Sequence, residues 1–374
     1  MIRILTILRW IVVFVALNAC VEPIAFEVPP PQDIIVLDGS INDMPGPYQL
    51  KIFRGRSVQH DTTYHFPVQR ATVTLHEDTG AEEAMLEGNP GEYSTRGIIQ
   101  GKVGRSYHVT VQLPDGQILT SEPETILPPG EISAVRHEFE ARTLHEAFGD
   151  VASDVFNIYI DSRGNAESKE SSFVRWRLRG VYTVKTRPEL HVTFLQVSAY
   201  MTPWPCSGFV VEPALGGGKL VQVAPCLCCD CWVRIFESTT RLSDTELVVD
   251  GEFRNVKVGE VPINRETFHD KFLAEVEQMP LSKTAYDYFK LIREQKEAPS
   301  NLFQPPMGRL RGNVNAQDPN YPVIGLFWAT SITRSSIYLT KDDVPYELPA
   351  MDLIAEPCNV YFANSTTTKP GQWK

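Results

Sequence analysis

The stretch YHVTVQLPDGQILTS, residues 107–121, decides the fold class. Apolar side chains alternate with polar ones over residues 107–113, which places the apolar set on one face of a β-strand. The Pro-Asp-Gly triplet at 114–116 predicts a tight turn, because proline presets φ and glycine accepts a positive φ. Residues 118–121 then predict the returning strand. The stretch therefore predicts an antiparallel hairpin with one buried face.

The same alternation continues on both sides of this hairpin and predicts a mainly all-β protein. Short alternating segments separated by turn residues, such as Asn-Pro-Gly at 89–91, predict an immunoglobulin-like β-sandwich of about 95 residues over 33–128. Prolines and a glycine at 123–130 mark a boundary, and residues 129–345 are predicted to form a larger β-rich domain. The polar, irregular residues 346–374 are predicted to form a surface tail.

One segment breaks the alternation and predicts an amphipathic helix over residues 282–298. Ser282 is a favourable N-cap residue, and a proline directly after the segment ends it. Ala285, Phe289 and Ile292 follow at a spacing that puts them on one helical face. We expect this face to pack against a sheet of the larger domain.

The first residues of the chain predict export and a lipid anchor. Two arginines precede an apolar stretch that is too short to span a bilayer, so residues 1–19 predict a signal peptide. Leu-Asn-Ala-Cys at 17–20 is similar to a lipobox, which predicts acylation of Cys20. The alternative is an ordinary secretory peptide with a chance cysteine. Residues 20–32 are rich in proline and predict a tether. Position 21 is valine rather than the aspartate that retains some lipoproteins at the inner membrane, which favours the outer membrane, on its surface or its periplasmic face.

The overall composition is that of an acidic globular protein. Its 374 residues are 43% hydrophobic and 22% charged, and the formal net charge is −11. Nucleic-acid binding needs clustered lysine and arginine, so the composition argues against a nucleic-acid partner. The acidic net charge also disfavours adhesion to anionic lipid by charge alone.

Six cysteines besides Cys20 predict disulfides, because the count is even and export leads to an oxidising compartment. Their connectivity stays open among 15 arrangements, although the adjacent Cys228 and Cys229 are not expected to pair with each other. The alternative is a metal site, since four thiols within residues 226–231 could chelate Cu(I) or Zn(II). A stapled loop followed by Trp232 would also offer a rigid contact surface. The candidate disulfide residues are Cys206, Cys226, Cys228, Cys229, Cys231 and Cys358.

A second unusual feature is an arginine row. Arg175, Arg177 and Arg179 alternate with apolar residues, so in a strand their guanidinium groups stand on one face about 6.6 Å apart. Such a row could bind a carboxylate, a phosphate or an acidic partner surface. The alternative is a solvated face paired with carboxylates of this acidic protein.

Several segments together carry a resemblance to a known family. They are IVLDG (35–39), GKVGRSY (101–107), LSKTAYDYF (281–289), FQPP (303–306), GNV (312–314) and GLFWA (325–329). With them, the chain resembles outer-membrane lipoproteins of Bacteroidota known as domain of unknown function 4249. The resemblance implies an N-terminal immunoglobulin-like or carboxypeptidase-regulatory-like sandwich, a larger β domain, and a genomic setting beside TonB-dependent receptors. It implies no catalytic residues, because the family has no established activity.

These observations predict a non-enzymatic accessory of a TonB-dependent outer-membrane transporter, which captures a ligand or covers the pore, with no cofactor. No nucleophile elbow or zinc-protease motif occurs in the chain. Two alternatives remain: a metal-binding lipoprotein that uses the cysteines at 226–231, and a cell-surface hydrolase.

Overall fold

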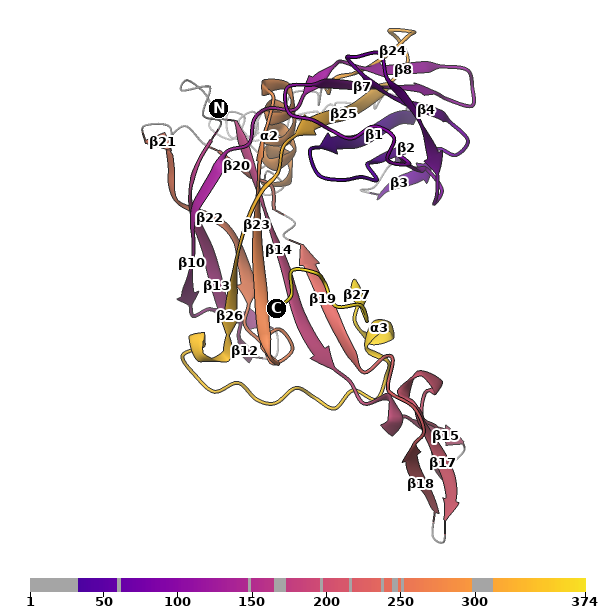
Figure 1. Cartoon of the computed structure of the whole chain (residues 1–374), viewed down its shortest axis with the longest axis vertical. Helices are drawn as coiled ribbons and strands as arrows, with labels where there is room; N and C mark the ends of the chain where they lie inside the picture. Colours follow the sequence, from indigo (N-terminus) through magenta and orange to yellow (C-terminus); the bar gives the residue numbers. More distant parts are fainter. Residues whose placement is uncertain are drawn as a thin grey trace, which may run out of the picture.

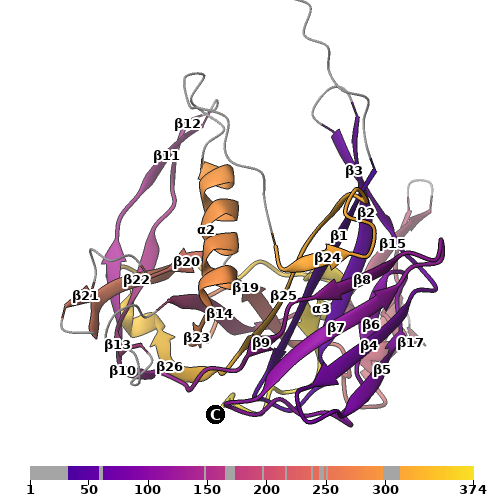
Figure 2. The same cartoon turned by 90° about the horizontal axis from the view of Figure 1, so that it is seen from above.

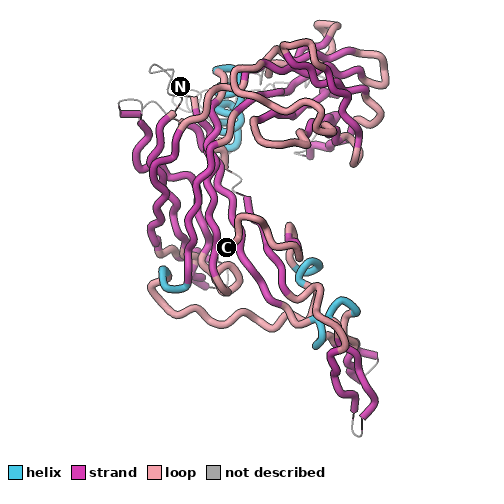
Figure 3. The backbone as a smooth tube through the Cα atoms, in the orientation of Figure 1, coloured by secondary structure: helices cyan, strands magenta, loops and turns pink. Residues whose placement is uncertain are grey.

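The computed structural model describes residues 33–374 except 59–61, 147–148, 165–172, 196–197, 215–216, 237–238, 244–247, 250–251 and 298–311. The predicted signal peptide, Cys20 and the tether at 20–32 lie outside the described residues, as does the segment at 303–306. The described chain is mostly β-strand, which confirms the predicted fold class. It forms two β-rich units and a projecting pair of hairpins, arranged as an arch (Figures 1 and 3). No helix in this part of the chain is long and apolar enough to cross a membrane.

The first unit is a curled sheet that closes around its own core. The strand order is β24-β8-β7-β4-β5-β6-β2-β1-β25, with β3 beside β2 and β9 beside β7. The strands are β1 (Asp33–Asn42), β2 (Gln49–Val58), β3 (Thr62–Pro67), β4 (Thr72–Glu77), β5 (Glu82–Glu87), β6 (Glu92–Ser94), β7 (Ser106–Gln112), β8 (Ile118–Ser121), β9 (Glu124–Thr125), β24 (Val314–Ala316) and β25 (Val323–Thr330).

The hairpin predicted from residues 107–121 is present as β7 and β8, which pair antiparallel. The side chains of Tyr107, Val109 and Val111 are fully buried, and the turn glycine, Gly116, has φ 89°. The alternation therefore separates a buried face from a solvated one, as the sequence predicts.

The first unit is not built from residues 33–128 alone. Strand β25 pairs in parallel with β1, with Leu37 opposite Gly325, and β24 pairs with β8. Asn313 links the two late strands: its side-chain amide donates to the carbonyl oxygen of Phe327, and its side-chain oxygen accepts from the Phe327 N–H. The sequence placed residues 312–330 in the larger domain, whereas the structure uses them to complete the first.

The second unit packs two sheets face to face. One has the order β10-β13-β22-β21, and the other β26-β23-β14-β19-β27 with β20 beside β14. Trp176, Phe156 and Phe253 lie in the core between them. The strands are β10 (Glu131–Glu140), β13 (Val155–Arg163), β14 (Val174–Lys185), β19 (Asp230–Phe236), β20 (Arg241–Leu242), β21 (Val248–Val249), β22 (Glu252–Pro262), β23 (Lys271–Pro280), β26 (Thr333–Thr340) and β27 (Ser365–Thr366).

The remaining elements are hairpins and short helices that decorate the second unit. The hairpins are β11 (Thr143–Glu146) with β12 (Gly149–Ala152), β15 (Val192–Leu195) with β16 (Ser198–Met201), and β17 (Phe209–Ala214) with β18 (Gly217–Gln222). The short helices are η1 (Pro188–Leu190), η2 (Pro205–Ser207), η4 (Lys341–Asp343) and α3 (Cys358–Tyr361).

Helix α2 (Lys283–Glu297) confirms the predicted amphipathic helix. The Ser282 hydroxyl accepts a hydrogen bond from the Ala285 N–H at 3.1 Å, so Ser282 acts as the N-cap. The sequence predicted that this helical face packs against a sheet of the larger domain. Phe289 instead contacts Trp328 of β25, in the first unit, with ring centroids 5.2 Å apart. Figure 2 shows α2 between the two units, where it joins them.

The final residues are not a free surface tail, as the sequence predicted. Cys358 is fully buried and forms a disulfide, and β27 pairs with β19. The Trp373 side chain is buried against Val181 and Leu273. The polar composition of this segment did not predict these contacts, because they depend on one cysteine, one tryptophan and a short backbone pairing.

Candidate functional site

The arginine row lies on the face of β14 that points away from the core. Trp176 and Leu178 are buried between the two sheets, so the alternating Arg175, Arg177 and Arg179 stand on the opposite face. In Figure 1, β14 runs between β23 and β19 along the second unit. The predicted geometry of the row is therefore present, and we call this surface the arginine face.

The centre of the arginine face is a fully buried carboxylate, that of Glu277 on β23. Its Oε2 accepts from Arg177 Nε at 2.7 Å, and its Oε1 accepts from Arg334 Nε at 3.1 Å. The Arg179 Nε lies 3.1 Å from Oε2 but is not aligned to donate to it. Three guanidinium groups thus share one carboxylate, and positive charge remains in excess.

Arg175 is a packing residue rather than a ligand contact. Its guanidinium carbon lies 4.3 Å from the ring centroid of Phe289 and 5.6 Å from that of Trp328, a cation–π arrangement. Burial, and then repulsion by Arg177, lower the pKa of Arg175 to about 10, so it is still protonated at neutral pH. We conclude that Arg175 holds α2 and β25 against the second unit.

At its other end, the arginine face opens into a cavity of about 230 Å³. Arg179 forms one wall, and Arg234 of β19 joins it because β19 pairs with β14 so that Arg234 stands opposite Val181. The Phe236 ring centroid lies 6.0 Å from the Arg179 guanidinium carbon. Sequence reasoning missed Arg234, since the pairing of two distant strands has no local signal. The lining residues are Arg179, Gly180, Val181, Arg234, Phe236, Leu273, Glu275 and Gln372.

Trp232 does not form the exposed contact that the sequence predicted. Its side chain is half-buried and packs against the cluster of Val181, Leu273 and Trp373. The register places it opposite Thr183 on β14 and Thr366 on β27. Trp232 therefore helps to attach the C-terminal segment.

All six cysteines predicted to form disulfides are paired. The bonds join Cys206 to Cys228, Cys226 to Cys229, and Cys231 to Cys358. Sulfurs bonded to each other supply no thiolate, which is the form that binds Cu(I) or Zn(II). Among the residues that the structure describes, no group of three or more His, Cys, Asp or Glu side chains is arranged to hold a metal ion.

The first two disulfides sit at the base of a projecting segment, residues 188–231, which we call the arm. It carries the hairpins β15–β16 and β17–β18, which extend from the lower end of the arch (Figure 1). Gly208 has φ 74°, and a Cβ there would lie 2.1 Å from the carbonyl oxygen of Ala224, so the base of the arm requires glycine. The disulfides and this close contact fix the base of the arm.

The arm exposes large apolar side chains. Phe194 is 75% and Leu227 73% exposed, and the other members of the set are at least 36% exposed. Formal charges are few, because residues 188–231 contain three carboxylates and one lysine. The exposed set is Phe194, Leu195, Tyr200, Met201, Val210, Val211, Val223 and Leu227.

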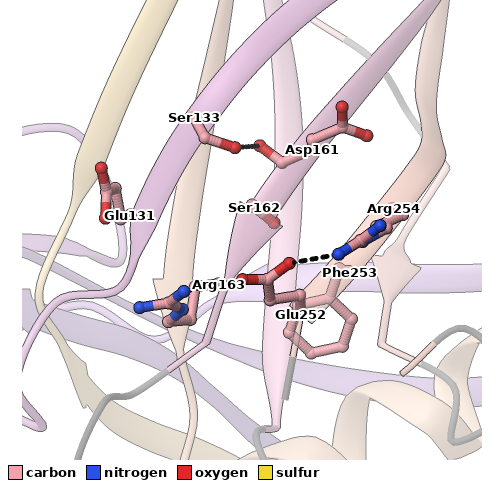
Figure 4. Close-up of a pocket in the computed structure, with 8 residues that line it drawn as sticks. All are labelled: Glu131, Ser133, Asp161, Ser162, Arg163, Glu252, Phe253 and Arg254. Atoms are coloured by element: carbon pink, nitrogen blue, oxygen red, sulfur yellow. Dashed lines mark hydrogen bonds and ion pairs between the residues drawn. The ribbon is translucent and has the colours of Figure 1, made fainter. Parts of the chain in front are cut away.

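A further cavity of about 240 Å³ lies where β10, β13 and β22 meet (Figure 4). Both of its arginines and two of its three carboxylates already form ion pairs. Glu252 pairs with Arg163 at 2.6 Å and with Arg254 at 3.1 Å, and Asp161 pairs with Arg136. This cavity therefore presents paired charges rather than unpaired donors.

Comparison with known families gives one match. The model of a domain of unknown function, DUF4249, matches residues 21–336. The chain belongs to this family. The match covers the first unit, most of the second unit, the arm and the arginine face, and it ends within β26. A search of the curated proteins found no match. Family membership confirms the predicted resemblance to domain of unknown function 4249, and the family description names no activity.

Proposed function

We propose that the protein is a non-enzymatic accessory lipoprotein of the outer membrane that docks on a TonB-dependent receptor through the arm. The observation that carries this proposal is the set of eight large apolar side chains exposed on the arm. A concentration of exposed large apolar side chains on one projecting segment is typical of an interaction site. The anchor at Cys20 and the choice of receptor rest on the lipobox and on the setting that the family resemblance implies.

The chemistry of the arm favours a protein partner with β-structure. Each hairpin of the arm is a separate two-stranded sheet among the described residues, so both outer edges of each keep unpaired backbone groups. A hydrocarbon layer cannot satisfy such groups, whereas another strand can pair with them. The scarcity of charge keeps the desolvation cost of docking low, and the fixed base reduces the entropy lost on binding.

A test is to purify the full-length protein from its native membrane in mild detergent and to quantify TonB-dependent receptors by mass spectrometry. We expect a receptor with the wild-type protein and at least a tenfold loss with Phe194→Ser plus Leu195→Ser. The matched control is Ile98→Ser, because Ile98 is 66% exposed in the connection between β6 and β7 of the first unit. Figure 1 shows β7 at the opposite end of the arch from the arm. Absence of a receptor, or equal recovery with the arm variant, would contradict the proposal.

The predicted anchor has its own test. The mature protein should begin at Cys20 with a diacylglyceryl group on its sulfur. Mass spectrometry of the N-terminal peptide measures the added mass directly. Replacing Cys20 by serine should move the protein to the aqueous phase on detergent partitioning. An unmodified N-terminal peptide would leave a secreted protein without an anchor.

A further inference from the structure

The arginine face is a cationic area on an acidic protein. Four arginines, Arg177, Arg179, Arg234 and Arg334, meet two glutamates there, while the whole chain has a formal charge of −11. Glu277 is fully enclosed by arginines, and Glu275 lies 3.9 Å from Arg334 Nε. Both carboxylates therefore already face a guanidinium group, and Arg179 and Arg234 line the cavity.

Two of these arginines, Arg179 and Arg234, line the cavity. Arg179 Nε is buried 3.1 Å from Glu277 Oε2, but it forms no aligned hydrogen bond within the part of the chain that the structure describes. Burial and then repulsion by Arg177 lower the pKa of Arg179, so the charged form of this side chain is destabilised when no ligand is bound. The side chain of Arg234 is exposed, and within the described residues it has no ion pair. A guanidinium group whose hydrogen bonds are incomplete gains free energy when an incoming acceptor completes them.

From this cavity, the two arginines that line it and its apolar wall, we infer a binding site for the carboxylate or phosphate group of a small hydroxylated organic anion. Arg179 and Arg234 donate to the oxyanion, and Phe236 contacts the carbon skeleton. Glu275 accepts from a hydroxyl of the ligand. The cavity of about 230 Å³ is smaller than the roughly 300–1,000 Å³ of pockets for drug-sized ligands, which favours a molecule of sugar-acid or sugar-phosphate size. This site is independent of the arm, so it goes beyond the proposed docking.

The experiment is an NMR titration of the full mature protein, in which the arginine Nε–H signals are followed. The probes are glucuronate and glucose 6-phosphate, with glucose as the neutral control that shares their ring. We expect both anions to shift the Arg179 and Arg234 signals selectively and glucose to leave them in place. The tighter of the two probes identifies carboxylate or phosphate as the preferred group.

Two variants complete the test. Arg234→Gln removes one donor of the cavity without touching the Glu277 cluster, and it should weaken binding at least about tenfold, because hydrogen bonds to charged groups are strong. Arg254→Gln, at a 67% exposed site on the other sheet, should leave the affinity unchanged. The inference is overturned if neither anion shifts the two signals at tens of millimolar, if glucose shifts them equally, or if Arg234→Gln binds as the wild type does. Loss of receptor docking in the arm variants would not affect these results.

Discussion

Replacing Glu277 by glutamine should be among the most destabilising single changes in the second unit. The wild-type carboxylate is fully buried and accepts in hydrogen-bond geometry from Arg177 and Arg334, with Arg179 Nε 3.1 Å away. Glutamine keeps one acceptor oxygen but turns an N–H₂ group towards a guanidinium. The three arginines then repel one another without a counter-charge.

The magnitude follows from the burial of the partners. Breaking a buried ion pair by removing one member costs about 3–5 kcal/mol. The arginine side chains of the cluster are 30–37% exposed, so solvent screens part of their repulsion and the lower end of that range applies. We therefore expect Glu277→Gln to lower the free energy of unfolding by about 3 kcal/mol. This is a large part of the roughly 5–15 kcal/mol that stabilises a typical domain.

Urea denaturation with the disulfides intact measures this effect. Trp176 is a suitable fluorescence probe, because it is buried in the same unit and its indole N–H donates to Gln278, next to Glu277. The matched control is Glu275→Gln on the same strand, where the nearest cation is 3.9 Å away and the expected loss is below about 1 kcal/mol. Equal losses for the two variants, or a loss below about 1 kcal/mol for Glu277→Gln, would refute the reasoning.

Three further predictions concern stability. Cys358→Ser opens a bond to Cys231 that spans 127 residues, so the thermal midpoint should fall by the equivalent of about 4 kcal/mol. Asn313→Ala removes both hydrogen bonds to Phe327 and should cost about 2 kcal/mol in denaturant unfolding, while Asn315→Ala, at an exposed position of the adjoining strand β24, should change little. Hydrogen bonding by Arg142 lowers the pKa of Glu260 from 4.5 to about 2, so this stabilisation is complete above pH 4.5 and is lost as the pH falls towards 2. Thermal unfolding across that pH window should show a steeper loss for the wild type than for Arg142→Gln.

Local patterns predicted the local structure. The hairpin at 107–121, the Ser282 N-cap and the pairing of all six cysteines besides Cys20 depend on residues near one another in sequence or on their count. Strand β25 could not be assigned to the first unit in this way. Its pairing with β1 joins residues almost 300 positions apart, and alternation does not name a partner strand.

The candidate site was predicted only in part, for the same reason. The alternation correctly placed Arg177 and Arg179 on one face. It could not reveal that Glu277, a polar residue in an ordinary strand, would be enclosed by three arginines, or that Arg234 would complete the cavity. Those features arise from the register between strands, which tertiary packing sets.

The most direct test of the central proposal is to place a photo-crosslinking amino acid at Tyr200, a 52% exposed position of the arm, in cells with an intact outer membrane. The same amino acid at Ile98 on the first unit serves as the reference. We expect a crosslink from position 200 to a TonB-dependent receptor, mapped by mass spectrometry, and a much weaker product from position 98. Crosslinks of equal yield at both positions, or no receptor among the products from position 200, would contradict it.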